Sequence, residues 1–138
     1  MNDANMIRVL VTDDEEDFRE SVAEFLRESF EVRTAANGDQ AVGHVARDRF
    51  DVVLLDLKMP GRPGMDVLRE LKGMDDGPEV IVVTAHGSVD AAVEAMRLGA
   101  YDFVTKPCHL GALAALIEKA TEKRNLLQTN ARRISCSF

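Results

Sequence analysis

Tryptophan is absent from this 138-residue chain, and aromatic residues make up only 5% of it. Any hydrophobic core must therefore be built from aliphatic residues. These are plentiful, since hydrophobic residues account for 46% of the chain. The length matches one compact domain, because single domains cluster at about 100–150 residues.

Cysteine is also scarce, and Cys108 and Cys136 lie far apart in the sequence. The chain has no CxxC motif and no cluster of Cys and His residues, so neither a zinc site nor a disulfide framework is indicated. We interpret both as ordinary thiols in a reducing compartment. His44 and His109 have no partner in the pattern, and we interpret them as a helix-surface and a helix-cap residue.

Long hydrophobic runs are missing as well. No stretch approaches the roughly 20 apolar residues that cross a bilayer, and the polar start MNDANMIRVL does not resemble a signal peptide. A net charge of −7 disfavours binding to nucleic acid or anionic lipid. We therefore expect a cytoplasmic protein, with no direct contact between this piece and nucleic acid or membrane.

What the sequence does contain is a regular alternation of strand-like and helix-like hydrophobic patterns. Residues 58–64 are predicted to form a loop, because two Pro and two Gly cannot sit inside a helix or strand. Short apolar runs predict strands at residues 7–11, 30–35, 51–56, 80–83 and 101–105. Helical spacing predicts helices near residues 18–26, 39–49, 65–73, 88–98 and from 109 to about 132.

The order βαβαβαβαβα predicts an α/β fold, with a parallel sheet covered by helices on both faces. For five strands we favour the flavodoxin-like order 2-1-3-4-5. Ligands of such sheets bind at the carboxyl ends of the strands where the order reverses, here between the first and third strands. The residues that follow these two strands are therefore the candidates for a functional site.

Carboxylates follow both of these strands. Asp13 and Asp14 come after the first, and Asp56 closes the third. Three neighbouring carboxylates repel one another, and a bound Mg²⁺, which prefers oxygen ligands, would resolve that conflict. An acidic helix start, stabilised by the helix dipole, is the plainer interpretation of residues 15–17, but it does not explain Asp56.

The fourth and fifth strands also end in polar residues. Thr84 can donate a hydrogen bond to a phosphoryl oxygen, and Lys106 supplies a compact positive charge. Each is weak alone, but together they surround Asp56 with the groups that phosphoryl transfer needs. The Asp56 carboxylate is then a plausible nucleophile that forms an aspartyl phosphate.

The segments VTDDE (11–15), LLDLKMPG (54–61), VTAHG (83–87) and FVTKP (103–107) resemble the receiver domain of two-component response regulators. The resemblance covers roughly residues 6–125. It implies that a sensor histidine kinase donates a phosphoryl group to Asp56.

The resemblance also implies a ligand set for Mg²⁺. Asp14 and Asp56 would bind through their side chains, Lys58 through its backbone carbonyl, and Asp13 mainly through water. In this family the Lys-Pro bond is commonly cis, so the bond between Lys106 and Pro107 is a candidate cis peptide.

For the switch, the resemblance implies that Thr84 moves toward the phosphoryl group and Phe103 turns inward, although simple core packing also explains Phe103. The output surface would be the fourth helix, fifth strand and fifth helix. Lys58 and His86 can approach Asp56, where they would hinder the attacking water and lengthen the lifetime of the phosphate. Ordinary solvent exposure explains these two residues equally well.

Residues 88–103 resemble receivers of sigma-54-type transcription activators, whose output domain would lie outside this chain. We expect the receiver domain to span residues 1–125. Residues 126–138 would be a helical extension suited to phosphorylation-dependent dimerisation, or equally a linker that ends in an expression remnant.

Other functions on this fold are a stand-alone receiver that shuttles phosphate or binds a partner, and a degenerate receiver that only binds proteins. The intact acidic, Thr and Lys set argues against the degenerate form. A haloacid dehalogenase-type phosphatase needs an acid where Lys58 stands, and a nucleotide or flavin site needs a Gly-rich turn where residues 13–15 stand. We therefore expect a regulatory acceptor, which catalyses at most its own phosphorylation and dephosphorylation.

Overall fold

The computed structural model describes the backbone of residues 6–136 and the side chains of residues 6–123. Strands and helices alternate along the chain, as the hydrophobic pattern predicts. In order, they are β1 (Arg8–Thr12), α1 (Glu16–Leu26), β2 (Glu31–Ala35), α2 (Gly38–Arg47), β3 (Val52–Leu55), α3 (Gly64–Lys72), β4 (Glu79–Thr84), α4 (Val89–Arg97), β5 (Asp102–Thr105) and α5 (Leu110–Cys136).

The sheet is parallel, with the strand order β2-β1-β3-β4-β5. The predicted topology is therefore confirmed, and most strand boundaries lie within one residue of those read from the pattern. In the register, Thr12 of β1 lies opposite Leu55 of β3. The residues that follow these two strands consequently leave the sheet side by side.

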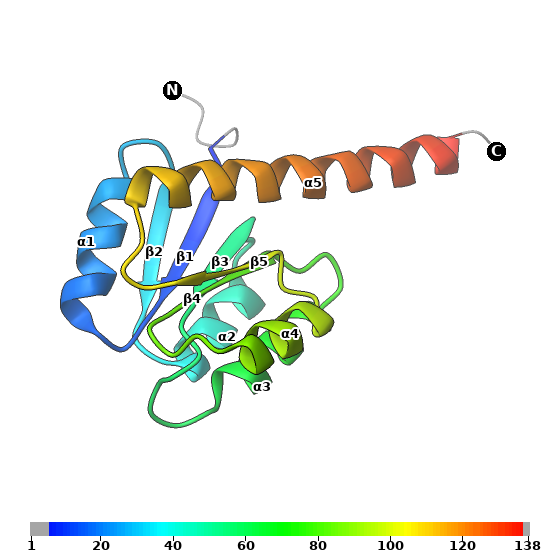
Figure 1. Ribbon diagram of the computed structural model, residues 1–138. Helices are drawn as coiled ribbons and strands as arrows, with labels where there is room; N and C mark the ends of the chain where they lie inside the picture. Colours follow the sequence, from blue (N-terminus) through cyan, green and yellow to red (C-terminus); the bar gives the residue numbers. More distant parts are fainter. Residues whose placement is uncertain (1–5, 137–138) are drawn as a thin grey trace.

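Two hydrophobic cores lie on opposite faces of the sheet. Helices α1 and α5 cover one face, and α2, α3 and α4 cover the other (Figure 1). Alternate residues of β1 divide between them, since Val9 and Val11 belong to the first core and Leu10 to the second. Strands covered on both faces must be apolar throughout, which explains the unbroken hydrophobic runs.

The helices bury most of the apolar residues that recur at helical spacing. In α3 and α5 these residues are buried, whereas Phe25 of α1 is 40% exposed. In α2, Ala41 is buried while Val42 and Val45 are only partly so. The buried α3 and α5 residues are Val67, Leu68, Leu71, Leu113, Ile117 and Ala120.

The loop between β3 and α3 closes tightly beside the site. Gly64 starts α3, and its N–H donates to the Leu57 carbonyl at 3.1 Å. A Cβ on Gly64 would lie 2.4 Å from the Leu57 Cα, so this approach requires glycine. At the end of α4, Gly99 adopts a φ of 104°, which explains why the helix stops there.

Helix α5 runs past the body of the domain (Figure 1). It continues to Cys136, rather than to about Arg132 as predicted, and its 27 residues span about 40 Å. The expectation of a dimerising extension concerns residues 126–138, whose side chains lie outside the described part. Within the described part, no helix combines the length and apolarity that a membrane crossing requires.

Candidate functional site

Two buried aspartates lie at the carboxyl edge of the sheet. Asp13 follows β1 and is 1% exposed, and Asp56 follows β3 and is 4% exposed. Backbone hydrogen bonds carry the sheet pairing one residue beyond the strands, from Asp13 N–H to the Ala35 carbonyl and from Asp56 N–H to the Thr12 carbonyl, both at 3.1 Å. The two carboxylates are therefore fixed beside each other by the backbone.

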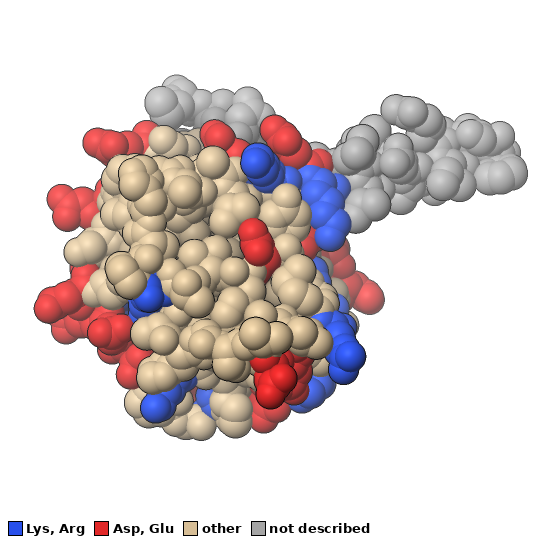
Figure 2. All heavy atoms as spheres, viewed as in Figure 1, with Lys and Arg blue, Asp and Glu red and all other residues tan. Residues whose placement is uncertain are grey.

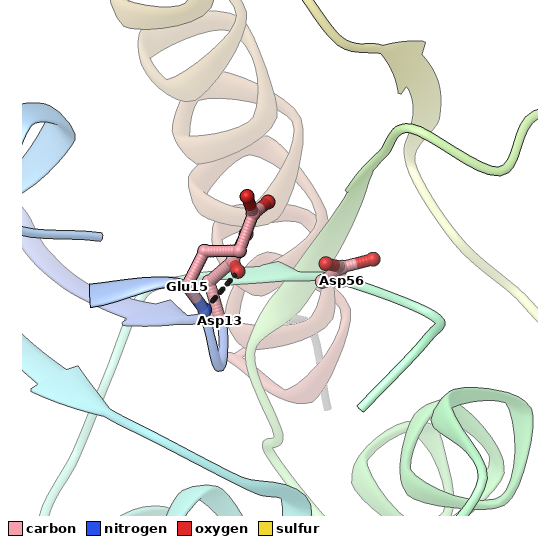
Figure 3. A group of neighbouring side chains, drawn as sticks. All are labelled: Asp13, Glu15 and Asp56. Atoms are coloured by element: carbon pink, nitrogen blue, oxygen red, sulfur yellow. Dashed lines mark hydrogen bonds between the residues drawn. The ribbon is translucent and has the colours of Figure 1, made fainter. Parts of the chain in front are cut away.

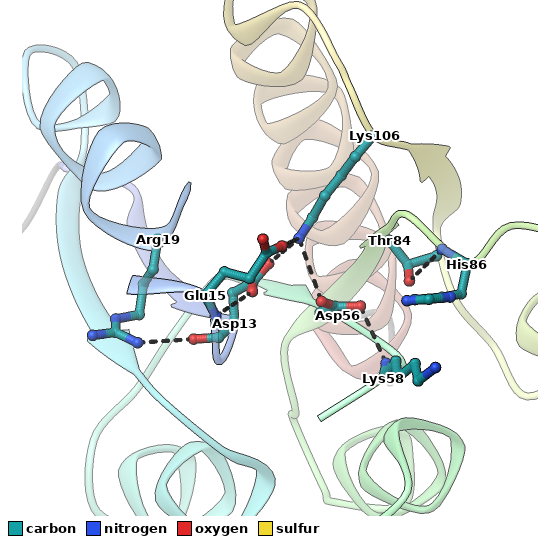
Figure 4. Close-up of polar contacts among 8 residues, drawn as sticks. All are labelled: Asp13, Glu15, Arg19, Asp56, Lys58, Thr84, His86 and Lys106. Carbon is teal, nitrogen blue, oxygen red and sulfur yellow. Dashed lines mark hydrogen bonds and ion pairs between the residues drawn. The ribbon is translucent and has the colours of Figure 1, made fainter. Parts of the chain in front are cut away.

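Lys106 reaches these carboxylates from the end of β5. Its backbone N–H donates to the Thr84 carbonyl at 2.9 Å, which anchors it beside β4. Its Nζ lies 2.6 Å from Asp13 Oδ2, 2.9 Å from Glu15 Oε1 and 3.4 Å from Asp56 Oδ2 (Figure 4). The side chain is only 8% exposed, so one ammonium group serves three carboxylates in a largely buried position.

From the sequence, Glu15 was explained only as part of an acidic helix start, but its carboxylate also contacts Lys106. Oxygen atoms of Asp13, Glu15 and Asp56 all lie within 4.8 Å of one another (Figure 3). Asp14, which was expected in the site, is exposed and outside this group. The chain at Glu15 is extended, with φ −80° and ψ 107°. Alternate side chains of an extended segment share a side, and this signal could have paired residues 13 and 15.

The charges in this group shift one another's pKa. Burial raises the pKa of Asp13 above its usual 3.8, and the Asp56 charge adds to that effect. Hydrogen bonds from Lys106 and from the Glu15 N–H act in the opposite direction. Burial would lower the pKa of Lys106, but its hydrogen bonds to Asp13 and Glu15, together with the negative charges of Asp56 and Asp13, outweigh burial and raise that pKa above 10.5. Lys106 therefore stays an ammonium at neutral pH.

Three further predicted residues line the other side of Asp56. Thr84 is fully buried, and its Oγ1 accepts from the His86 N–H at 3.2 Å. The Lys58 N–H donates to Asp56 Oδ1 at 3.1 Å, while the Lys58 and His86 side chains are exposed. In Figure 4, His86 and Lys58 lie across Asp56 from Glu15. The structure thus brings together Asp13, Asp56, Thr84 and Lys106, with Lys58 and His86 at the rim.

Phe103 and Pro107 lie on β5 and just after it. Phe103 is partly buried and packs against the core beneath α2, α3 and α4. The peptide bond between Lys106 and Pro107 is cis, as the family resemblance suggested. Cys108 is a free thiol whose pKa is raised by burial.

The group of oxygen ligands fits a divalent cation. Two of its carboxylates are buried and share a single Lys106 ammonium, so the site carries uncompensated negative charge. Carboxylate and carbonyl oxygens are the ligands that Mg²⁺ prefers, and it commonly uses only one or two carboxylates and keeps several waters. Asp13 and Asp56 present carboxylates to such a cation from the rigid edge of the sheet, either directly or through a bound water.

A family model described as "Response regulator receiver domain" matches residues 9–118, which is most of the chain. The chain belongs to the receiver domain family of response regulators. The resemblance seen in the four sequence segments is thereby confirmed. The matches include regulators of the sigma-54 activator class, as residues 88–103 predicted.

Three relatives illustrate the range of this receiver family. Response regulator protein PilR of Pseudomonas aeruginosa is 37% identical over 86% of the chain, which spans only 27% of PilR. Sporulation initiation phosphotransferase F of Bacillus subtilis is 35% identical over 81% of the chain, which spans 91% of that relative.

The third is a solved response regulator from Burkholderia pseudomallei, described with a phosphorylated aspartic acid, a calcium ion and citrate. It is 25% identical and has a TM-score of 0.76, with 88% of this chain and 72% of that one covered. The chain spans about a quarter of the length of several curated relatives, PilR among them.

Proposed function

We propose that this receiver domain accepts a phosphoryl group on Asp56 from the phosphohistidine of a sensor histidine kinase. The observation that carries the proposal is the setting of Asp56, a buried carboxylate 3.4 Å from the Lys106 ammonium at the edge of the sheet. The phosphorylated aspartic acid of the relative from Burkholderia pseudomallei supports it. Phosphoryl transfer asks a protein mainly for positioning and charge neutralisation, and this edge offers both.

In the proposed reaction, one Asp56 oxygen attacks phosphorus and forms a P–O bond as the P–N bond of the phosphohistidine breaks. The electron pair of that bond leaves with the imidazole ring of the kinase, which is neutral after the transfer because its other nitrogen carries a proton. Lys106 offsets charge on the phosphoryl oxygens, and the Thr84 hydroxyl donates to one of them. The Lys58 N–H, which already donates to Asp56 Oδ1, holds the carboxylate in place for the attack.

Mg²⁺ is the cofactor that we propose for this site. Asp14 and Asp56 would hold it through their side chains, Lys58 through its carbonyl, and Asp13 through water, as the family resemblance implies. When bound, the cation would neutralise charge that builds up on the phosphoryl oxygens. Glu15 is a further nearby carboxylate, and the Asp14 side chain would turn from its exposed position to join the ligands.

The proposed output is a change on the face formed by α4, β5 and α5, driven by Thr84 and Phe103. Val89, Val93 and Met96 of α4 are exposed apolar residues, 80%, 44% and 46% accessible, and suit contact with a partner. Figure 2 shows acidic side chains along the edge where α1 lies, so charge is distributed unevenly over the domain. We propose that this face controls a transcriptional output domain and a phosphorylation-dependent homodimer in the cytoplasm.

A second function, the phosphate shuttle, is favoured by one comparison. The chain spans 91% of sporulation initiation phosphotransferase F, so a receiver of this size exists without an output domain. A shuttle would remain monomeric on phosphorylation and would pass its phosphoryl group to a histidine phosphotransfer protein. Light scattering of the phosphorylated protein separates this function from the dimeric regulator. In either role the chain is a regulatory acceptor.

The test of the acceptor is direct. The protein is incubated with acetyl phosphate and Mg²⁺, and its intact mass is recorded beside those of Asp56→Asn and Asp66→Asn. Asp66 is an exposed aspartate of α3, so its variant controls for the loss of one carboxylate. We expect a hydroxylamine-labile adduct on the wild type and on D66N but not on D56N. An unmodified wild type under conditions where Mg²⁺ binds would refute the proposal.

A further inference from the structure

We propose that Glu15 is a positioning residue that holds the Lys106 ammonium on the α1 side of the site and thereby slows phosphorylation of Asp56. The inference rests on the proposed function of Asp56 and extends it to a residue to which the sequence pattern gave only a role in starting a helix. In this proposal, the Glu15 carboxylate and the phosphoryl group compete for the Lys106 ammonium.

The position of Lys106 is the first observation. Its Nζ lies 2.6 Å from Asp13 and 2.9 Å from Glu15, but 3.4 Å from Asp56. Charge-assisted N–H···O bonds are about 2.7–2.9 Å long, so only the first two contacts have full strength. The ammonium therefore lies toward the segment that joins β1 to α1.

Phe18 supplies a second contact on the same side. Lys106 Nζ lies 4.0 Å from the centroid of the Phe18 ring, within the range of a cation–π interaction. Phe18 is one turn along α1 from Glu15, so both contacts come from the start of a single helix. Two different interactions thus draw the ammonium away from Asp56.

Apart from its contact with Lys106, the Glu15 side chain contributes little to the fold. It occupies the N-cap position of α1, but its side chain makes no capping hydrogen bond. Its backbone N–H donates to Asp13 Oδ1 at 2.9 Å, and this bond needs no Glu side chain. A carboxylate at a helix start also gains from the helix dipole, but Glu16 and Asp17 occupy that region as well. The contact with Lys106 is therefore the specific role of the Glu15 side chain.

Phosphorylation of Asp56 would change which oxygen atoms Lys106 contacts. A phosphoryl group carries about −1.5 to −2 charges, more than the carboxylate it modifies. The phosphoryl oxygens would bind the Lys106 ammonium, which would then lose at least part of its contact with Glu15. The Glu15 side chain is 64% exposed, so water screens this pair and its effect on the rate is modest. We expect a two- to fivefold change.

The experiment compares Glu15→Gln, Glu15→Asp and Glu16→Gln with the wild type at saturating Mg²⁺. Glu16→Gln removes the same charge from the first turn of α1, but Glu16 is not among the carboxylates that pair with Lys106. Glu15→Asp keeps the charge and shortens the reach. The readouts are the phosphorylation rate with acetyl phosphate and the affinity for beryllofluoride, a stable mimic of the phosphoryl group.

We expect E15Q to be phosphorylated two- to fivefold faster than the wild type and to bind beryllofluoride more tightly, with E15D intermediate and E16Q unchanged. A general charge effect would accelerate E15Q and E16Q equally and would overturn the inference. Slower phosphorylation of E15Q would also overturn it, because Glu15 would then assist the reaction. A wild type that accepts no phosphoryl group would instead refute the proposed function, and this inference with it.

Discussion

Replacing Lys106 with Met tests the charge balance of the site, because Met has a similar length and no charge. Lys106 is 8% exposed, and its partners Asp13 and Asp56 are 2% and 5% exposed at their side chains. Removing one partner of a buried ion pair typically costs about 3–5 kcal/mol, since the remaining charge is left uncompensated. The site lies at the edge of the sheet, where water can enter, so we expect the lower value of about 3 kcal/mol.

The assay is urea denaturation with and without Mg²⁺. Without Mg²⁺, K106M should lose about 3 kcal/mol, which for a domain of this size lowers Tm by roughly 10 °C. With Mg²⁺ present, the loss should shrink by more than about 1 kcal/mol, because the cation replaces the missing charge beside the carboxylates. Mg²⁺ would thus stabilise the variant more than it stabilises the wild type.

Lys72→Met is the matched control. Lys72 Nζ lies 3.4 Å from Glu79 Oε1, and Glu79 is also largely buried, but this pair lies at the start of β4, at the opposite edge of the sheet from Asp56. K72M should therefore be destabilised without any extra response to Mg²⁺. A loss below about 1 kcal/mol in K106M, the size of an exposed ion pair, would refute the reasoning. So would equal Mg²⁺ responses of K106M and K72M.

The pH dependence provides a second check of the Lys106 pair. The folded state raises the pKa of Lys106 above 10.5, so the folded protein holds this proton more tightly than the unfolded chain does. The stabilisation is then fully present below pH 10.5 and is lost as the pH rises through the folded pKa. The stability difference between wild type and K106M should consequently narrow in that alkaline range, as urea denaturation at several pH values would show.

Two further predictions concern the loops and the lifetime of the phosphate. Gly64→Ala should destabilise the domain by about 1–3 kcal/mol, because the new Cβ would lie 2.4 Å from the Leu57 Cα. Gly43→Ala, in the middle of α2, should instead stabilise it by about 1 kcal/mol. Thermal unfolding measures both changes, and two stability changes of the same sign would contradict the argument. If the exposed Lys58 and His86 side chains hinder the attacking water, Lys58→Asn and His86→Ala should each shorten the lifetime of the Asp56 phosphate severalfold. Intact mass recorded over time after removal of acetyl phosphate measures this lifetime, and unchanged lifetimes would exclude this role.

The fold could be predicted from the sequence because its signals are local and repeated. Each buried strand appears as a short apolar run, and the residue that follows it is polar. Since parallel strands end at one edge, Asp13, Asp56, Thr84 and Lys106 could be brought together before any coordinates were considered. The prediction depended on the strand order, which the alternation of strands and helices strongly restricts.

Side-chain direction in the loops was harder to predict. Asp14 and Glu15 are adjacent acids after β1, and the hydrophobic pattern does not show whether the chain is still extended there, which decides which of the two side chains turns inward. The structure places Glu15 against Lys106 and leaves Asp14 exposed, because the chain at Glu15 is extended rather than helical. The direction of a loop side chain depends on partners far away in sequence, and Lys106 is such a partner, 91 residues from Glu15.

The charges in the site suggest an order of events. When ionised, Asp13, Glu15 and Asp56 bring three negative charges, and Lys106 brings one positive charge, which leaves about two negative charges near Asp56. An incoming phosphoryl donor is also an anion, so this charge repels it. A bound divalent cation would cancel most of this excess charge, and Lys106 would then be free to contact the phosphoryl oxygens. The same arrangement that destabilises the metal-free site thus favours binding of the cation before phosphoryl transfer, and phosphorylation should depend steeply on Mg²⁺.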